Sequence, residues 1–349
     1  MTKQVNNKLN IATIGYGGMG TYHVHGLIAA EADYLQVVGI YDIDQERKDV
    51  AEETGTYVYP AFEAILDDQE VDAVLIATPN DSHKDLAIRS MRAGKHVICE
   101  KPVAMNTQEF DEMIAVSEET GRVLMVHQNH RWDPDFLQVK DIFTKRQAVG
   151  DVFQIESRVH GANGANGIPG DWRYLKAHGG GMVLDWGIHL FDQLLWLVDS
   201  PIKSVHSDLS YILGDEVDDG FVAYITFENG IRAHVEVGTS NFISLPRWYI
   251  KGNQGTAIIE DWEMNGRIVK ATGNDVENKP SPIRAGVGLT KTMAPPVDGV
   301  TETLPLPESK PAATSFYKNF YDVVVNGAEP IVKNDQVRQV MQLIDHILA

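Results

Sequence analysis

The sequence predicts an α/β protein in which a doubly wound parallel sheet is followed by an α+β domain with a large, mainly antiparallel open sheet. The 349 residues are too many for one ordinary core and fit two domains. Strand-like and helical stretches alternate in the first third of the chain, which favours a parallel sheet. Strand-like runs then follow one another with short turns, which favours an antiparallel sheet.

Five apolar runs in the first third are typical of buried parallel strands, which helices cover on both faces. The runs span residues 9–14, 35–41, 72–77, 95–99 and 123–127. The helical stretches between them lie near residues 18–30, 44–54, 60–67, 81–93 and 107–120.

The pattern changes after residue 131. We expect helices near residues 135–145, 181–198, 314–326 and 334–348, and strands near 151–160, 203–213, 219–228, 231–240, 247–252, 255–260 and 267–271. Asn229-Gly230 indicates a two-residue hairpin turn. Residues 272–312 are rich in Pro, Gly and Lys, and we expect an irregular segment: a lid, an oligomer contact or a disordered stretch.

The composition excludes several classes of partner. The formal charge is −19, which repels nucleic-acid phosphates and anionic lipid, so we expect neither nucleic acid nor a membrane as partner. The single cysteine, Cys99, allows no intrachain disulfide. The polar start has no signal-peptide apolar region, and no stretch approaches the ~20 apolar residues of a membrane span. We therefore expect a cytoplasmic protein.

A glycine-rich loop joins the first predicted strand to the first helix. Its residues, Gly15-Tyr16-Gly17-Gly18-Met19-Gly20, match G-x-G-x-x-G. The first glycine permits a tight turn, the second lets a pyrophosphate approach the backbone, and the third permits close helix–strand packing. Free N–H groups at the helix start would hold the phosphates. The motif in this position predicts a bound dinucleotide.

Asp42 ends the second predicted strand, 22 residues after Gly20. A carboxylate there can accept hydrogen bonds from both adenosine ribose hydroxyls and would repel a 2′-phosphate. Ile43 follows it rather than Arg, so NAD is favoured over NADP. The alternative is a helix N-cap, because Asp42 and Asp44 both precede a helix.

The third predicted strand ends in Thr78-Pro79-Asn80, beside the expected cofactor groove. Asn80 can reach a ribose or an amide; the alternative is a simple turn and helix cap. His83 lies one turn into the next helix, and we include it among the groove residues, although a general-base role is disfavoured there.

Glu100-Lys101-Pro102 follows the fourth predicted strand. Open α/β sheets bind ligands at the carboxyl ends of their strands, and folding does not require the charge of Lys101 at that edge. Together with the glycine loop, this lysine indicates nicotinamide redox chemistry rather than a generic nucleotide site.

Asp185 and His189 are four residues apart on one face of an otherwise apolar helix. Two interpretations stay open: an internal Asp–His hydrogen bond that supports the core, or a catalytic pair. A metal site is disfavoured, because the sequence shows no further ligand cluster.

These motifs together resemble those of the Gfo/Idh/MocA oxidoreductase family, named for glucose–fructose oxidoreductase, inositol dehydrogenase and a rhizopine catabolism protein. The matching positions are the glycine loop with His23, Asp42, Thr78-Pro79-Asn80, Glu100-Lys101-Pro102, and Asp185 with His189. The resemblance spans almost the whole chain.

The resemblance implies a Rossmann dinucleotide-binding domain over residues 1–130 and an α+β substrate and oligomerisation domain over residues 131–330. It implies that a C-terminal helix within residues 331–349 packs back on the Rossmann domain, and that Pro102 follows a cis peptide bond. It also implies a homodimer or homotetramer.

The resemblance further implies that Lys101 and His189 carry the chemistry with Asp185 beside them. His189 would take a hydroxyl proton and Lys101 would stabilise the alkoxide, while Asp185 would orient His189 or bind a neighbouring hydroxyl. The expected cofactor contacts are Gly15, Tyr16, Gly17, Gly18, Met19, Gly20, Asp42, Ile43, Thr78, Pro79, Asn80, His83, Glu100, Lys101 and Asn129.

The expected substrate contacts are Lys101, Arg131, Trp172, Arg173, Asp185 and His189. Trp172 and Arg173 follow a glycine-rich loop over residues 161–167 and suit a sugar, because indole faces pack on C–H surfaces and guanidinium groups donate to hydroxyls. For these two residues the alternative is an ordinary packed loop.

We therefore expect an NAD(P)-dependent dehydrogenase that transfers a hydride between nicotinamide and a secondary hydroxyl of a sugar, inositol or related polyol. One alternative enzyme uses the cofactor transiently to cleave or isomerise a glycoside. The other alternative is a non-catalytic dinucleotide-binding sugar sensor. The presence of Lys101, Asp185 and His189 together argues against the sensor, which needs no acid–base set.

Overall fold

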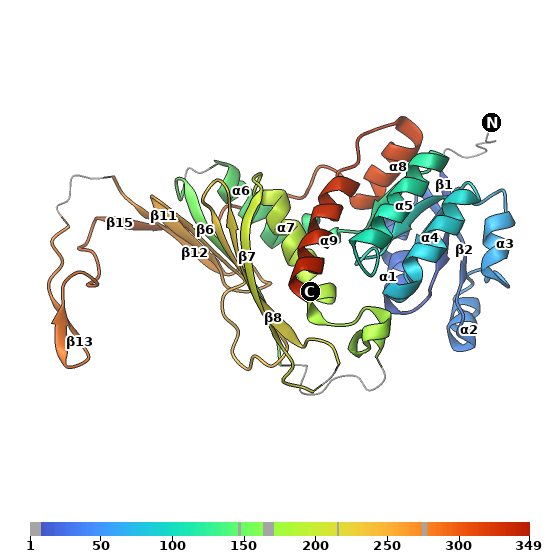
Figure 1. Cartoon of the computed structure of the whole chain (residues 1–349). Coiled ribbons are helices and arrows are strands. Elements are labelled where there is room, and N and C mark those ends of the chain that lie inside the picture. Colours follow the sequence, from blue (N-terminus) through green and yellow to red (C-terminus); the bar gives the residue numbers. More distant parts are fainter. Residues whose placement is uncertain (1–7, 146–147, 163–170, 215, 274–277) are drawn as a thin grey trace.

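Two large sheets with helices packed between and around them, and a separate two-stranded pair, make up the described structure (Figure 1). The computed structural model describes residues 8–145, 148–162, 171–214, 216–273 and 278–349. The predicted fold class is confirmed: a parallel sheet of the Rossmann type is followed by a mainly antiparallel open sheet.

The first sheet consists of the apolar runs of the N-terminal third, which form five parallel strands in the order β2-β1-β3-β4-β5. The strands are β1 (Leu9–Ile14), β2 (Leu35–Tyr41), β3 (Ala73–Ile76), β4 (His96–Cys99) and β5 (Leu124–Val126). Every residue of β3 and β5 is buried, as expected for a parallel sheet that helices cover on both faces.

Helices connect these strands and follow the last of them. They are α1 (Gly18–Tyr22), η1 (His23–Ile28), η2 (Ala29–Glu31), α2 (Gln45–Glu53), α3 (Phe62–Asp67), η3 (Asn80–Ser82), α4 (His83–Arg92), α5 (Thr107–Thr120) and η4 (Asn129–Trp132). The helix predicted over residues 18–30 is not uniform, because α1 passes into the π-helical turns of η1. Such wide turns often occur at functional sites.

The second sheet has eight strands in the order β15-β12-β11-β10-β6-β9-β8-β7. They are β6 (Val152–His160), β7 (Ile202–Ser210), β8 (Gly220–Phe227), β9 (Arg232–Gly238), β10 (Trp248–Gly252), β11 (Gly255–Ile259), β12 (Gly266–Ala271) and β15 (Thr301–Leu304). β6 and β9 pair in parallel, and the other neighbouring pairs of the sheet are antiparallel.

One face of this sheet packs on helices, and the other face lies on the outside of the molecule (Figure 1). Along β9, Ala233, Val235 and Val237 are buried while the residues between them are partly exposed. The helices on the buried side are α6 (Pro134–Lys145), the π-helical η8 (Val183–Gly187) and α7 (Ile188–Leu197), and the short helices η6 (Trp172–Tyr174) and η7 (Lys176–His178) precede η8.

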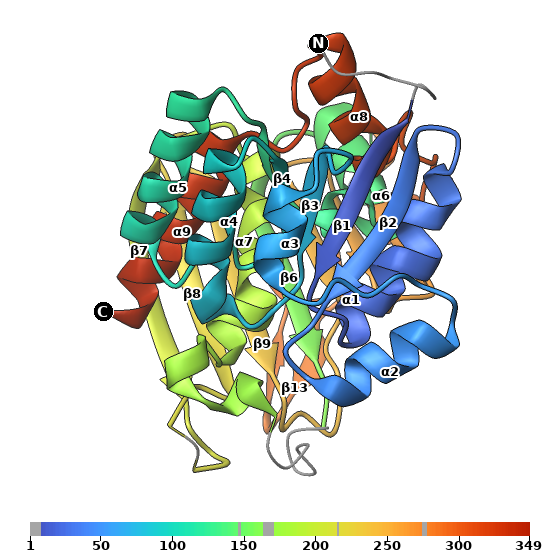
Figure 2. The same cartoon turned by 90° about the vertical axis from the view of Figure 1, so that its right-hand side faces the viewer.

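The last two helices are α8 (Phe316–Asn326) and α9 (Asn334–Leu348). α9 lies between α7 of the second domain and α5 of the first, and Figure 2 shows it beside α5. Arg338 Nε donates to Asp111 Oδ1 at 2.6 Å, and the Thr107 backbone N–H donates to the carboxylate of Asp345 at 2.9 Å. The C-terminal helix thus joins the two domains.

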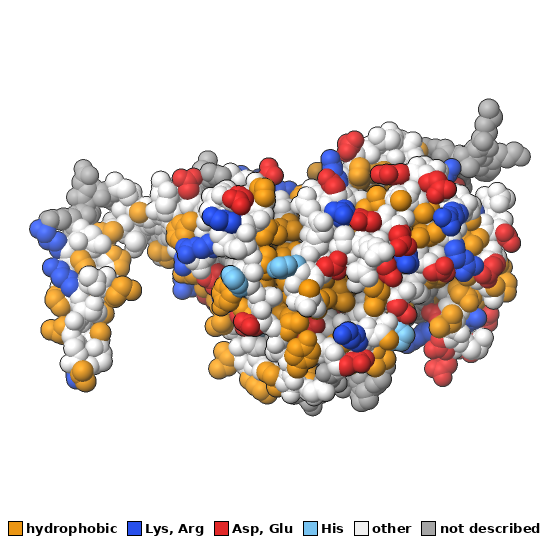
Figure 3. All heavy atoms as spheres, viewed as in Figure 1, with side chains coloured by type: hydrophobic (Ala, Val, Ile, Leu, Met, Phe, Trp, Pro, Cys, Tyr) orange, Lys and Arg blue, Asp and Glu red, His pale blue; other side chains and the backbone are white. Residues whose placement is uncertain are grey.

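Two local predictions are wrong. The connection at Asn229-Gly230 is not a two-residue turn, since β8 ends at Phe227 and β9 begins at Arg232, and only Gly230 has a positive φ. Asn229 instead accepts a hydrogen bond from the N–H of Ile231 at 3.1 Å, which stabilises a longer turn. Residues 272–312 are not wholly irregular, because they contain β13 (Ile283–Ala285), β14 (Gly288–Thr290) and β15. The strands β13 and β14 pair with each other, and this hairpin stands apart from the rest of the molecule (Figures 1 and 3).

Within the described ranges, no helix combines the length and apolar character that crossing a bilayer demands.

Candidate active site

The glycine loop has the geometry that a pyrophosphate site needs. Gly15 has a φ of +91°, and a Cβ there would lie 2.6 Å from the carbonyl oxygen of Ala77. A Cβ on Gly20 would lie 2.0 Å from the carbonyl oxygen of Gly15, so the helix and strand meet too closely for a side chain. Among the described residues, a Cβ at Gly17 would meet no atom within 4 Å, and no side chain caps α1. The helix N-terminus is therefore open to a phosphate.

Asp42 lies against this loop at the end of β2. Its Oδ2 accepts the backbone N–H of Tyr16 at 2.6 Å, and its Oδ1 accepts the N–H of Asp44 at 2.9 Å. The N-cap of α2 is Asp44, which accepts the N–H of Glu46 at 2.9 Å. An ionised carboxylate has about four acceptor positions, so Asp42 retains capacity for ribose hydroxyls. Ile43 beside it is largely exposed.

The predicted groove residues after β3 make internal contacts. Buried Asn80 donates from Nδ2 to the carbonyl oxygen of Gly179 at 2.9 Å and so joins the two domains. Both ring nitrogens of His83 lie 2.9 Å from backbone carbonyl oxygens, those of Pro102 and Thr78. Burial lowers the pKa of His83. His83 therefore supports the turn that carries Lys101, and the expected cis peptide bond before Pro102 is present.

Lys101 of the first domain meets Asp185 of the second. Its Nζ donates to the main-chain carbonyl oxygen of Asp185 at 2.8 Å and to Oδ1 of the same residue at 3.1 Å. Arg173 Nε lies 3.7 Å from the same Oδ1. Burial by itself would raise the pKa of Asp185, but the charges of Lys101 and Arg173 outweigh burial and lower it. The carboxylate is thus ionised between two cations.

His189 lies one turn further along, with 4% of its surface exposed. Its Nδ1 has no hydrogen-bond partner within the described part of the chain, and its ring centroid lies 3.9 Å from that of His130. Burial, with the nearby charge of Lys101 and the ring of His130, holds the pKa of His189 well below its ordinary value. The imidazole is therefore neutral near pH 7 and able to accept a proton.

Asp185 and His189 do not form the internal hydrogen bond that their spacing allowed. Asp185 lies in the π-helical η8 and His189 in α7, and the carboxylate of Asp185 pairs with Lys101 and Arg173. A π-turn closes over five residues rather than four, so the two side chains do not face each other as in a regular α-helix.

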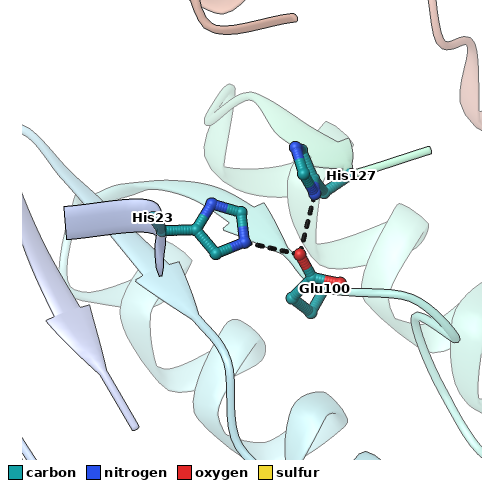
Figure 4. A group of neighbouring side chains, drawn as sticks. All are labelled: His23, Glu100 and His127. Carbon is teal, nitrogen blue, oxygen red and sulfur yellow. Dashed lines mark hydrogen bonds and ion pairs between the residues drawn. The ribbon is translucent and has the colours of Figure 1, made fainter. Parts of the chain in front are cut away.

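Glu100, which directly precedes Lys101 in the chain, forms a buried cluster with His23 and His127 (Figure 4). Glu100 Oε1 lies 2.6 Å from His23 Nε2 and 2.7 Å from His127 Nδ1, and its Oε2 accepts the backbone N–H of Lys101 at 3.1 Å. Burial would raise the pKa of Glu100, but attraction and hydrogen bonds from His127 and His23 outweigh it, and the pKa lies well below its usual value. Two histidines and a glutamate are residue types that bind metal ions. Their contacting atoms, however, lie at the distance of direct hydrogen bonds.

A cavity of about 540 Å³ opens beside Asp185 on the second sheet. Its walls include the indoles of Trp186 and Trp262, whose centroids are 6.1 Å apart, together with Arg173 and Asp218. Asp218 accepts the N–H of Val183 at 3.0 Å, and burial raises its pKa to about 6. The cavity thus combines aromatic faces with acidic and basic groups.

The structure does not bring every predicted residue to the cavity and the group of Lys101, Asp185 and His189. Arg131 is buried, and its guanidinium donates to Asp192 at 2.7 Å and to Gln336 at 2.8 Å. Trp172 stacks under Arg173, whose guanidinium lies 4.6 Å from the ring centroid. Asn129 begins η4, directly before His130. Of the glycine-rich loop before Trp172, positions 163–167 lie outside the described residues.

Several residues that line the site were not predicted to do so. His130 could have been found, because it follows β5 at the same edge as Lys101. No local sequence pattern marks Asp218 or Trp262 as a site residue, since each lies in a turn far from Lys101 in sequence. The arrangement of the strands in the second sheet brings the two turns to the same cavity.

Known proteins match this chain over almost its whole length. Residues 9–128 match the model of an oxidoreductase family with an NAD-binding Rossmann fold, and residues 136–258 match the GFO/IDH/MocA C-terminal domain. A solved NAD-binding protein from Listeria innocua is 57% identical, with a TM-score of 0.94 over 98% of this chain and 97% of that one.

Two curated relatives are more distant. The oxidoreductase YdgJ of Escherichia coli is 28% identical, and the match covers 98% of this chain and 96% of YdgJ. A myo-inositol 2-dehydrogenase of Thermotoga maritima is 28% identical over 231 residues, 64% of this chain and 66% of that enzyme. The chain therefore belongs to the GFO/IDH/MocA family of oxidoreductases with an NAD-binding Rossmann domain.

Proposed function

We propose that the protein is an NAD-dependent dehydrogenase that oxidises a secondary hydroxyl of a sugar, inositol or related polyol. The observation that carries the proposal is the contact of Lys101 with Asp185 beside the neutral His189. This group lies at the carboxyl edge of the dinucleotide-binding sheet, next to a cavity lined with aromatic and charged side chains.

The cofactor site supports NAD rather than NADP. The open glycine loop would hold the pyrophosphate, and Asp42 would accept the ribose hydroxyls. The negative charge of Asp42 opposes a 2′-phosphate, and the adjacent Ile43 supplies no cation to attract one. When bound, the nicotinamide supplies the hydride acceptor.

The protein groups would handle the proton and the charge. Neutral His189 would take the hydroxyl proton, while the hydride leaves the same carbinol carbon and a carbonyl group remains. The ammonium of Lys101 would donate to the oxygen as its negative charge develops. Asp185 would hold that ammonium in place, and Arg173, which pairs with the same carboxylate, would bind a neighbouring hydroxyl.

The cavity supports a polyhydroxylated substrate. Indole faces such as those of Trp186 and Trp262 pack on C–H surfaces, and the carboxylates and guanidinium beside them bind hydroxyls. Its volume falls within the range of about 300–1,000 Å³ that small-molecule sites occupy. A relative named for myo-inositol oxidation supports the same substrate class.

The test is a panel of inositols, aldoses and polyols with NAD or NADP, followed at 340 nm, with the Lys101→Met variant as control. We expect NADH formation with at least one polyol, and its loss in the variant. Conversion of a glycoside without NADH release would indicate transient redox chemistry instead. Sugar binding without any turnover would indicate a sensor. Either result would overturn the dehydrogenase proposal.

A further inference from the structure

The ring of His189 lacks the hydrogen bond that usually orients a catalytic histidine. A general base is commonly aimed by a third group that binds its other ring nitrogen. Nδ1 of His189 has no such partner within the described part of the chain, although the residue is only 4% exposed. A contact other than a hydrogen bond must therefore fix the orientation of this ring.

Two aromatic rings pack beside His189. The ring of His130 lies 3.9 Å away between centroids, at an angle of 55°, and that of Trp186 lies 5.9 Å away at an angle of 64°. Aromatic pairs usually have centroids about 4.5–7 Å apart, so the contact with His130 is a close one. The rings of His130 and Trp186 also lie beside each other, with centroids 5.6 Å apart. The three rings thus form one packed group.

His130 is itself held at two points. Its ring donates from Nδ1 to the carboxylate of Asp133, and its main-chain carbonyl oxygen accepts Nε2 of buried Gln193 at 2.7 Å. Gln193 follows His189 by four residues in α7, so the two side chains lie on the same side of that helix. The helix that carries the base therefore also binds the turn that carries His130.

The charged groups that act on His189 come from four elements. Lys101 lies just after β4, His127 follows β5, His130 lies in η4 and Arg247 directly precedes β10. Positive charge on each of them opposes a proton on His189, and burial opposes it more strongly, so the pKa of His189 lies well below its ordinary value. His130 contributes to both effects, because its ring covers His189 and can itself carry a positive charge.

We propose that His130 is the positioning residue of the catalytic base, an inference that rests on the dehydrogenase function proposed above. The His130 ring, which Asp133 holds, keeps the ring of His189 in one orientation and shields it from water. Nδ1 of His189 is buried in this packing, which leaves Nε2 to accept the hydroxyl proton. Without the His130 ring, His189 turns about its Cβ–Cγ bond and water reaches it. A misplacement of about 1 Å in a reacting group costs about 10²-fold in rate.

The first test compares two substitutions of His130 in the full chain, with NAD and a polyol that the parent oxidises. His130→Ala removes the ring and should lower kcat by about 10–100-fold, with a change of less than about threefold in the Kd for NAD. His130→Phe restores a ring and should recover most of that loss. The control is His206→Ala, at an exposed position in β7. Equal losses in the two His130 variants, or parental turnover in His130→Ala, would overturn the proposal.

The second test separates positioning of the base from general support of the fold. His130→Ala lets water reach His189 and removes a positive neighbour, and both changes raise the pKa of His189 toward its ordinary value of about 6.5. The acid limb of kcat/KM should therefore move to higher pH in this variant, and NMR titration of the His189 ring should show the same shift. The His189 signal is identified by its absence in His189→Asn. An acid limb and a titration that both stay at the parental pH would contradict the inference.

The NMR titration also keeps the two proposals apart, because it needs no turnover. A parent that oxidises no polyol would refute the dehydrogenase, and the titration would still show whether His130 covers His189. A parent that is active, with His130→Ala equally active, would refute only the role of His130.

A third test asks whether Asp133 acts through His130. Asp133→Ala frees the His130 ring and should lower kcat by roughly three- to tenfold, whereas Asp133→Asn keeps an acceptor oxygen and should cost less. Added to His130→Ala, the Asp133→Ala change should cause no further loss, since the ring that it holds is already gone. A full additional loss in the double variant would show that Asp133 does not act through His130.

Discussion

The ammonium of Lys101 lies 2.8 Å from the main-chain carbonyl oxygen of Asp185 and 3.1 Å from its carboxylate. One cation thus joins the end of β4 to η8 of the second domain. The same contact places the cation beside the neutral ring of His189. The proposed oxidation needs this combination: a fixed positive charge for the oxygen and an unprotonated base for the hydroxyl proton.

Replacement of this cation tests the centre of the proposal. Lys101→Met should lower kcat by a factor of about 10²–10³, because one preorganised donor to a developing oxyanion is worth that much. Affinity for the dinucleotide should change less than about threefold, since the glycine loop and Asp42 hold the phosphates and the ribose. Steady-state kinetics and cofactor titration measure both, with the exposed Lys203→Met as control. Near-parental turnover in Lys101→Met would show that another group stabilises the oxygen.

The pH dependence of kcat/KM tests His189. Burial and the charge of Lys101 lower its pKa, so the imidazole stays unprotonated well below its ordinary value of about 6.5. Activity should therefore hold as the pH falls through 6.5 and decline only at lower pH. His189→Asn should lower kcat by about 10²–10⁴ and abolish that decline. A parental profile that falls near pH 6.5–7 would contradict the assignment.

Cofactor preference tests Asp42. Asp42→Ala should weaken NAD binding by about ten- to a hundredfold, because ribose hydrogen bonds to a carboxylate are each worth about 1.5–3 kcal/mol. NADP binding should improve, since the repelling charge is lost. Asp44→Ala is the matched control: it removes the N-cap of α2, at about 1 kcal/mol of stability, and should leave the NAD/NADP ratio unchanged. Equal ratios in both variants would exclude a ribose role for Asp42.

Glu100 should contribute to stability above its titration range. Its pKa is lowered in the folded protein, so its contribution is present above the unfolded value of about 4.5 and is lost as the pH falls through the folded value. Glu100→Gln should cost about 2–3 kcal/mol at pH 7, because the negative charge is lost and the amide nitrogen of Gln cannot accept the hydrogen bonds made to the oxygen that it replaces. The difference should shrink in acid. Urea unfolding at several pH values measures it, and a cost that does not depend on pH would contradict this account.

Ionisation of Asp218 should destabilise the folded protein, the opposite of the effect expected for Glu100. Its pKa is raised by burial from the ordinary value of 3.8 to about 6, so ionisation of the folded protein costs stability as the pH rises through that window. Asp218→Asn removes this cost and keeps an acceptor for the N–H of Val183. Between pH 4 and pH 7, the free energy of unfolding of the variant should rise relative to that of the parent by on the order of 3 kcal/mol. Denaturation at both pH values measures the gain, and a constant difference would contradict it.

Local patterns determined much of this protein. The strands of the first sheet follow from apolar runs, and the glycine loop follows from steric limits that act within a few residues, as the close contacts at Gly15 and Gly20 show. The carboxyl-edge position of Lys101 follows from strand order in parallel sheets. These features depend on backbone sterics and on the period of burial, so one chain segment is enough to specify them.

The tertiary structure decided which side chains meet. Asp185 pairs with Lys101 and Arg173 rather than with His189, because a π-turn changes the helical spacing and a lysine from the other domain reaches the carboxylate. Arg131 lies at the predicted edge, yet its guanidinium binds buried Asp192. The cavity depends on the order of eight strands. Contacts between segments far apart in sequence are selected by packing, and no local pattern encodes them.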